Sequence, residues 1–209
     1  SMEPVHVRRL GRTSYSDAHA LQQELLTARL DGTAPDTLLL TEHERVVTLG
    51  RGSPRGAQGD TTLPVFEVER GGEATWHGPG QLVAYPILLL SEARRDLHRY
   101  LRDLEEVVIG VLADHGVRGT RVEGRTGVWT SGRKLCSIGV AVRRWTTWHG
   151  LALNVTNDLA DFHAFAPCGL DPNVMTRLVD HAPHATMETA ERSLLVNFTR
   201  VFDVELDTD

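Results

Sequence analysis

Residues 70–87 read RGGEATWHGPGQLVAYPI, which joins a glycine-rich segment to an apolar one. The glycines can take positive φ or let a ligand approach the backbone closely, and Pro79 stiffens the turn between two of them. The apolar run that follows, LVAYPILLL, is typical of a strand buried on both faces of a sheet. We therefore predict a binding loop that is fixed to a central core strand.

The same stretch carries three side chains that suit a binding site. Arg70 supplies a charge, Trp76 an aromatic surface and His77 a titratable ring. A glycine-rich hairpin without chemistry is the simpler interpretation of an isolated Gly-Gly or Pro-Gly pair. The combination with Trp76 and His77 favours a functional loop, because binding residues often lie on loops held by a rigid scaffold.

The composition indicates one globular domain. The chain has 209 residues, of which 41% are hydrophobic, enough for one sizeable core. No apolar run approaches the roughly 20 residues that cross a bilayer, and the N-terminus has neither the basic nor the apolar region of a signal peptide. We expect a cytoplasmic protein with no membrane partner. Ser1 before Met2 resembles the remnant of a cleaved tag, which leaves residues 2–209 as the domain.

The net charge of −6 argues against nucleic acid as a partner. Basic residues nevertheless gather in one place, at Arg94, Arg95, Arg99 and Arg102. Such a cluster forms either a solvated helix face or a surface that docks an acidic protein, and the sequence leaves both interpretations open.

One basic residue is unusual. Lys134 is the single lysine among 22 basic residues, so arginine is the default cation of this chain. Arginine stays protonated, whereas a desolvated lysine can exchange a proton near neutral pH. The lone lysine therefore favours a chemical role over chance survival.

The two cysteines exclude a disulfide framework and a four-cysteine zinc site. Cys168 lies in the loop sequence APCGL, where a thiol can be exposed and backbone amides can face a reacting carbonyl. Cys136 lies in the alternating sequence KLCSIGVAV, which predicts a small core residue. If Lys134 approaches Cys168 in space, its ammonium would favour the thiolate and form an acyl-transfer dyad with it.

Ten histidines raise the question of a metal. His77, His149, His163 and His181 are candidate ligands beside Cys168, but the chain contains no HExxH or CxxC motif. We therefore expect no metal. The glycines match neither a phosphate-binding loop nor GxGxxG, so no nucleotide is required.

Apolar spacing and turn residues predict a single α+β or mixed α/β domain. Strands are expected at residues 5–10, 37–41, 46–49, 65–68, 82–90 and 203–206, with an antiparallel meander at residues 127–130, 134–144 and 148–155. Helices are expected from a Ser16 cap to Gly32, over residues 96–115, and over residues 187–202 after a Thr186 cap.

Three blocks of sequence together resemble a known family. They are RGGEATWHGPGQLVAYPI, GVWTSGRKLCSIGVAVRRWTTWHGLALNV and FAPCGLDPNVMTRL, which occur in the family's order and at similar spacing. On these residues the chain resembles the bacterial octanoyltransferases of protein lipoylation, over nearly its whole length. It departs from the family pattern at Cys136, where alanine or glycine is more common, and at Arg177, where serine is common.

The resemblance implies a fold and a set of site residues. The fold is that of the biotin and lipoate ligase catalytic domains, a single domain with a mixed, mostly antiparallel sheet flanked by helices. Cys168 would be the nucleophile that forms an acyl-thioester, and Lys134 the residue that favours its thiolate and relays protons. The acyl-binding residues would be Arg70, Gly71, Gly72, Glu73, Ala74, Thr75, Trp76, His77, Ser137, Ile138, Gly139, Gly150, Leu151 and Ala152, with His149 as a further pocket residue.

The resemblance also implies a reaction and partners. Octanoyl would move from octanoyl-acyl carrier protein to a lysine of lipoyl domains, those of 2-oxoacid dehydrogenase complexes and the glycine cleavage H protein, without a cofactor and in a monomer. Two alternatives remain open from the residues. One is an ATP-dependent lipoate or biotin ligase, and the other is a non-catalytic acyl-binding or metal-binding protein.

Overall fold

The apolar run after the glycine-rich loop forms β6 (Gln81–Ile87), the central strand of a seven-stranded sheet. All of its residues are buried, as predicted for a strand covered on both faces. The computed structural model describes residues 3–208, so Ser1, Met2 and Asp209, including the expected tag remnant, lie outside the described residues.

The large sheet has the order β10-β1-β2-β6-β9-β8-β7. Strand β1 runs parallel to β2 and β10, and every other neighbouring pair is antiparallel, which confirms the mixed, mostly antiparallel sheet. The predicted meander forms its far edge. The remaining strands of this sheet are β1 (Val5–Thr13), β2 (Thr37–His43), β7 (Gly127–Thr130), β8 (Arg133–Arg143), β9 (Thr146–Asn154) and β10 (Leu206–Thr208).

A second, three-stranded sheet has the order β4-β3-β5. It contains β3 (Val46–Leu49), β4 (Val65–Glu67) and β5 (Ala74–His77). We predicted a binding loop between the strands at residues 65–68 and 82–90, and Ala74–His77 within it instead forms strand β5. The reason is tertiary pairing, since β5 lies antiparallel to β3 with Trp76 opposite Val47.

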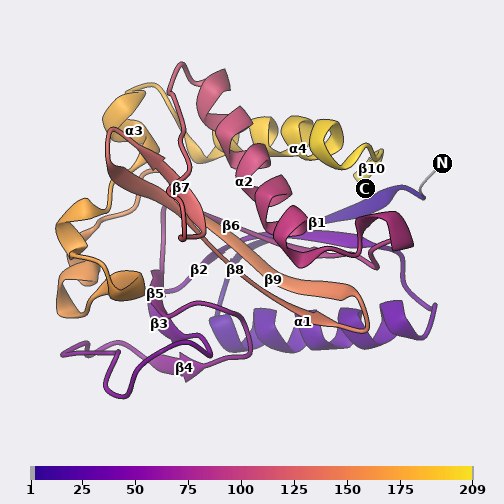
Figure 1. Cartoon of the computed structure of the whole chain (residues 1–209), viewed down its shortest axis with the longest axis horizontal. Helices are drawn as coiled ribbons and strands as arrows, with labels where there is room; N and C mark the ends of the chain where they lie inside the picture. Colours follow the sequence, from indigo (N-terminus) through magenta and orange to yellow (C-terminus); the bar gives the residue numbers. More distant parts are fainter. Residues whose placement is uncertain (1–2, 209) are drawn as a thin grey trace.

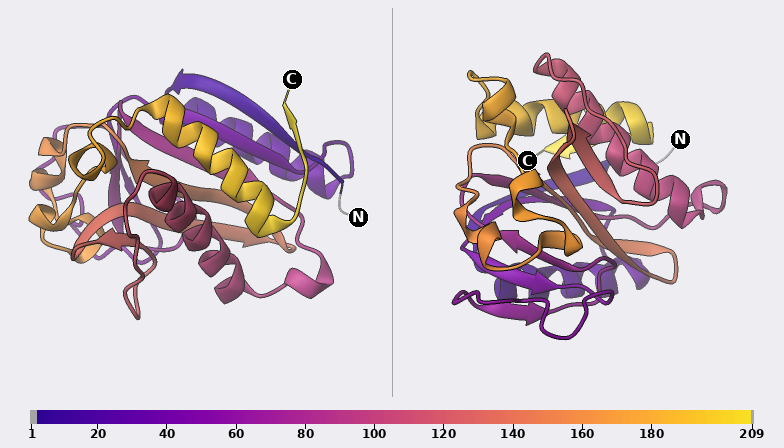
Figure 2. Two further views of the ribbon diagram at one scale, coloured as in Figure 1. Left: turned by 90° about the horizontal axis from the view of Figure 1, so that it is seen from above. Right: turned by 60° about the vertical axis from the view of Figure 1, so that its left-hand side comes forward.

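Helices cover both faces of the large sheet (Figure 1). Helices α2 (Leu97–Asp114) and α4 (Met187–Phe202) lie on one face, and α1 (Tyr15–Leu30) lies on the other. Figure 2 shows α2 and α4 side by side over one face of the sheet, and the strands at its edge, β1 and β10, pair in parallel. The shorter helical segments are η1 (Glu92–Arg94), η2 (Ala160–Ala164), η3 (Pro167–Gly169), η4 (Pro172–Val174) and α3 (Leu178–His181).

Two element ends differ from the sequence prediction. Helix α1 begins after Ser14, whose extended backbone lets its hydroxyl accept from the amide of Asp17, so Ser16 is not the cap. The last strand begins at Leu206 because Asp203 adopts a left-handed conformation at the end of α4. Over the described residues, no helix combines the length and the apolar character needed to cross a membrane.

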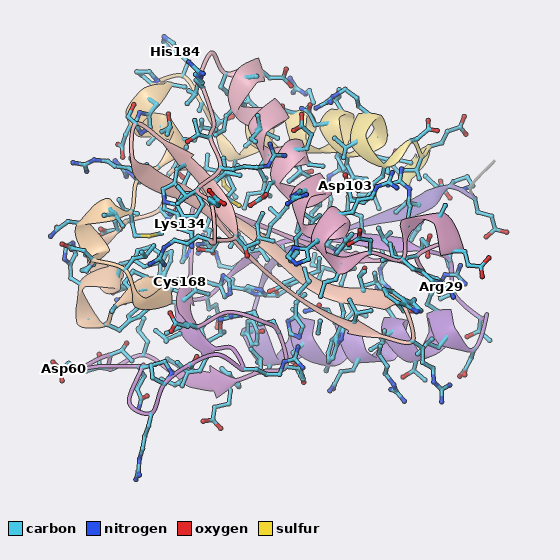
Figure 3. All side chains as sticks on the ribbon, in the orientation of Figure 1. Arg29, Asp60, Asp103, Lys134, Cys168 and His184 are labelled. Carbon is cyan, nitrogen blue, oxygen red and sulfur yellow. The ribbon has the colours of Figure 1, made fainter. Side chains whose placement is uncertain are left out.

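The arginine cluster serves mainly to anchor the start of α2. Arg94 pairs with Asp103 at 3.4 Å and lies over the ring of Phe202. Arg95 and Arg99 donate hydrogen bonds to backbone carbonyls. In Figure 3, Asp103 lies away from the end of the molecule that carries Cys168, so this cluster is remote from the candidate nucleophile.

The cap of α4 allows a direct test of the fold. Thr186 accepts from the amide of Thr189, and Thr189 accepts from the amide of Thr186, each at 3.0 Å. We expect Thr186→Ala to lower the free energy of unfolding by about 1 kcal/mol, because it leaves a helix amide without a partner. Urea unfolding measures this change. Thr199→Ala, near the other end of the same helix, is the control and should change stability little; an equal loss in both variants would contradict the cap's role.

Candidate functional site

A cavity lies between the large sheet, the second sheet and the turn that carries Cys168. Thirteen of the residues predicted from sequence line it: Arg70, Gly71, Gly72, Thr75, His77, Ser137, Ile138, Gly139, His149, Gly150, Leu151, Ala152 and Cys168. Two further lining residues, Tyr15 and Tyr85, were not predicted, because an aromatic residue in a helix or a buried strand is usually core.

Strand β5 divides its residues between two environments. Thr75 and His77 line the cavity, whereas Ala74 and Trp76 pack in a separate core cluster with Phe162. Successive strand residues point to opposite faces, which explains the division. The Trp76 indole donates a hydrogen bond to Asp161 at 2.9 Å, and its ring packs in that cluster and does not line the cavity.

Arg70 holds the glycine-rich loop in place. Its side chain is buried and donates to the carbonyl of Gly71 and to the carbonyl and hydroxyl of Thr48 at 2.7–3.0 Å. Gly71 in turn donates its amide to Val140 of β8 at 2.9 Å. Burial lowers the pKa of Arg70, and negative charge on Cys168 would oppose that shift, which indicates that the two groups are electrostatically coupled.

Cys168 stands on a strained turn. Its backbone is left-handed, with φ 52° and ψ 33°, a conformation that is uncommon for a residue other than glycine. Two backbone hydrogen bonds fix the turn: the amide of Gly169 donates to the carbonyl of Ala166, and the amide of Leu170 donates to that of Pro167. The carboxylate of Glu73 lies against Gly169, so the glycine-rich loop and the cysteine turn pack directly on each other.

The two cysteines differ in environment. Cys168 is half-buried and lines the cavity. Cys136 is fully buried in the core between β8 and the helices, and burial raises the pKa of its thiol to about 12. A thiol that stays protonated is a poor nucleophile, so the environment favours Cys168 as the reactive cysteine.

Lys134 lies at the start of β8, 3% exposed, and is not among the residues that line the cavity. Its ammonium lies 5.3 Å from the centre of the Trp129 ring. The Lys134 carbonyl accepts from the amide of Thr176, which ties the segment after Cys168 to β8. Figure 3 shows Lys134 and Cys168 toward the same end of the molecule. The absence of a side chain at Gly127 leaves room for the lysine, because a Cβ there would stand 2.9 Å from the Lys134 Cε.

Gly139 and Gly150, expected to open a slot for an aliphatic chain, have a different structural reason to be small. A Cβ at Gly150 would lie 2.2 Å from the carbonyl oxygen of Ala84, and one at Gly139 would lie 2.7 Å from that of Gly71. Both glycines therefore let neighbouring backbone approach β8 and β9. A larger residue at either position would disturb this packing as well as the cavity.

A layer of buried histidine and tyrosine lies beside the cavity. Burial lowers the pKa of His43 to about 4 and of His77 to about 3, so both rings are neutral near pH 7. Nδ1 of His43 lies 3.2 Å from both the carbonyl and the hydroxyl of Thr13, and Nε2 forms a hydrogen bond of 2.6 Å with the hydroxyl of Tyr85.

His149, another lining residue, forms a cluster that the sequence did not reveal. Its Nε2 lies 3.0 Å from a carboxylate oxygen of Glu69, which also contacts Nε2 of His19. Burial lowers the pKa of His149 to about 4. His77, His163 and His181, the other candidate histidine ligands from sequence, do not join this cluster, and neither does Cys168. His19 and Glu69 carry no local signal, because the cluster exists only through tertiary contacts.

Comparison with known proteins identifies the family. The model of the lipoyl protein ligase A/B catalytic domain matches residues 14–199. An octanoyltransferase of Geobacter metallireducens is 54% identical over 78% of this chain and 77% of its own length, and one of Geobacter sulfurreducens is 50% identical over 90% and 81%. The chain belongs to the octanoyltransferase family. It is therefore an enzyme of this family, as the sequence motifs predicted.

Solved structures support the fold. An archaeal lipoate protein ligase from Thermoplasma acidophilum has a TM-score of 0.78 at 16% identity, covering 100% of this chain and 87% of its own. The biotin protein ligase of Aquifex aeolicus has a TM-score of 0.55 at 11% identity, covering 97% and 70%. At such identities the likeness concerns the fold alone. It confirms that this chain has the predicted fold of the biotin and lipoate ligase catalytic domains.

The neutral His43 predicts how stability depends on pH. Its pKa is lower in the folded state than the unfolded value near 6.5, so the folded protein binds fewer protons. The stability linked to neutral His43 is present above about pH 6.5 and is lost as pH falls toward about 4. We expect the free energy of unfolding to fall by about 2 kcal/mol from this group between pH 7 and pH 5.

Urea unfolding of the parent and His43→Gln at both pH values measures this contribution. The variant should be less stable at pH 7, because it loses the bond to Tyr85, but its stability should depend less on pH. Equal pH dependence in the two proteins would show that His43 does not titrate in this way.

Proposed function

We propose that this enzyme moves an octanoyl group from octanoyl-acyl carrier protein to a lysine of lipoyl domains, through a thioester on Cys168. The observation that carries the proposal is the half-buried Cys168 on a left-handed turn, where it lines a cavity together with the binding residues that the family motifs predicted. The family membership supports the octanoyl group as cargo. The buried, protonated Cys136 leaves Cys168 as the available nucleophile.

In the first step, the Cys168 thiolate attacks the thioester carbonyl of the donor. A bond forms between Sγ and the acyl carbon, the carbon–sulfur bond to the carrier's thiol breaks, and the carrier leaves as a thiol after gaining a proton. We assign the positive charge of Arg70, which lines the same cavity as Cys168, to stabilising the negative charge of this step. We assign two roles to Lys134, the buried cation at the start of β8. Its charge also stabilises the Cys168 thiolate, and its ammonium donates the proton that the leaving carrier thiolate gains.

In the second step, the acceptor lysine amine attacks the acyl-enzyme. A carbon–nitrogen bond forms, Cys168 leaves as a thiolate, and the amine proton passes to Lys134. The acyl chain lies during both steps in the cavity beside Ser137, Ile138 and Ala152. Ser137 is half-exposed within the strand, so its side chain borders open cavity space.

The thioester donor is already activated, so the reaction needs no ATP. This distinguishes the proposal from an adenylating ligase of the same fold, such as the lipoate-protein ligase A whose structure is described as bound with ATP. The lipoyl domains we propose as acceptors are those of 2-oxoacid dehydrogenase complexes and the glycine cleavage H protein. A cytoplasmic location and a monomeric state belong to the same proposal.

The nucleophile assignment predicts different outcomes for the two cysteines. Cys168→Ser should abolish octanoyl transfer and the hydroxylamine-sensitive octanoyl adduct, whereas Cys136→Ser should keep most activity. Intact-mass analysis after incubation with octanoyl-acyl carrier protein, without ATP, measures the adduct. Adduct formation in Cys168→Ser, or transfer that requires ATP, would overturn the thioester mechanism.

The two roles of Lys134 can be separated. Lys134→Arg keeps the positive charge but removes a readily exchanged proton, so alkylation of Cys168 by iodoacetamide near neutral pH should persist while octanoyl transfer falls by about 10²–10⁴-fold. Lys134→Met should lose both the alkylation of Cys168 near neutral pH and octanoyl transfer. A fully active arginine variant would remove the proton-relay role, and alkylation of Lys134→Met with the parent's pH profile would remove the electrostatic role.

A further inference from the structure

Three metal-binding side chains from distant parts of the chain meet beside the cavity. His19 comes from α1, Glu69 from the loop before β5, and His149 from β9. The oxygens of Glu69 lie 3.0 and 3.1 Å from Nε2 of His19, and one of them lies 3.0 Å from Nε2 of His149. Within residues 3–208, this is the one group of three such side chains whose ligand atoms all lie within 4.8 Å of one another.

The spacing of the Glu69 oxygens from the two histidine nitrogens is close to that of zinc ligands. Zinc binds imidazole nitrogen and carboxylate oxygen at about 2.0–2.2 Å in a tetrahedral arrangement, so its ligand atoms lie roughly 3.3–3.5 Å apart. The nitrogen–oxygen distances here are shorter by a few tenths of an ångström, and a small outward movement would admit an ion. We infer that His19, Glu69 and His149 form a site for a divalent transition-metal ion of the zinc class.

The donor set determines the class of ion. Two imidazoles with one carboxylate suit zinc, cobalt or nickel, whereas magnesium and calcium require oxygen ligands. Three protein ligands leave a fourth position open, as in exchangeable and catalytic zinc sites. The Glu69 side chain is 41% exposed and that of His19 is 21% exposed, which gives an ion a path from solvent.

The ligand rings are oriented before any ion binds. Neighbouring strand residues normally face opposite ways, yet the rings of Trp148 and His149 both reach His19, at centroid distances of 5.6 and 5.8 Å. The left-handed backbone of His149, with φ 55°, accompanies this break in alternation. Gln22, on the same helix as His19, accepts from the His149 amide at 2.7 Å. This preorganisation reduces the entropy cost of binding.

The site should exchange its ion and not hold it permanently. Without an ion, Glu69 accepts hydrogen bonds from both rings. Coordination through Nε2 moves the His149 proton to Nδ1, which is buried and has no partner among the described residues. Metal-binding histidines usually have an acceptor at that nitrogen, and its absence weakens binding. Because His149 also lines the cavity, a bound ion would tie α1 to the cavity wall.

Titration of the full chain with Co²⁺ tests the inference. The Cys168→Ser variant is the parent protein for this experiment, so that a thiolate cannot supply a competing ligand. We expect one Co²⁺ per chain with the visible absorption of a tetrahedral ion, displaced by Zn²⁺ and removed by a chelator but unaffected by Mg²⁺. Zn²⁺ should also raise the melting temperature.

Matched variants identify the ligands. In the same parent, His19→Ala and Glu69→Gln should weaken Co²⁺ binding by at least about 10-fold and abolish the zinc-induced rise in melting temperature. His163→Ala, which changes an exposed histidine outside the cluster, should bind as the parent does. Failure of the parent to bind one ion per chain, or unchanged binding in His19→Ala with a native circular dichroism spectrum, would overturn the inference.

Discussion

A buried guanidinium holds the two sheets of this protein around the cavity. Arg70 donates to Thr48 in the small sheet, and the adjacent Gly71 donates to Val140 in the large sheet. Within the described residues, Arg70 forms no salt bridge with a carboxylate: backbone and hydroxyl oxygens accept from its two terminal nitrogens, and its buried Nε has no partner. A buried charge is costly unless it is well hydrogen-bonded, so the loop conformation is strongly specified.

The alternation of strand residues then distributes side chains around that cavity. Thr75 and His77 face it, while Ala74 and Trp76 close a separate cluster. In β9 the alternation fails at His149, and two successive rings reach the same helix. Regular strand geometry thus explains most of the lining, and one strained residue explains the exception.

The sequence predicted features that follow from local patterns and missed features that depend on tertiary contacts. Strong local patterns, such as the apolar run of β6 and the spacing of α2, fixed their elements correctly because burial itself produced the pattern. The family motifs identified most of the cavity lining. By contrast, β5 was missed because a four-residue strand depends on pairing with β3. Tyr15, Glu69 and His19 were missed because their roles arise from contacts between distant segments, which no local pattern encodes.

The fold is shared with ligases, so the proposed mechanism assigns the chemistry of this enzyme to local charge and to Cys168. Burial keeps His43, His77 and His149 largely neutral near pH 7, although they lie in or beside the cavity. Because neutral rings add no positive charge, Arg70 is the one positively charged side chain among the described residues that line the cavity. In the proposed mechanism, a thiolate at Cys168 would experience the fixed charge of Arg70 inside the cavity, where electrostatic attraction is stronger than in water, beside the charge assigned to Lys134. The neutral histidines thus contribute hydrogen bonds to the cavity wall, and the proposed activation of Cys168 relies on Arg70 and Lys134.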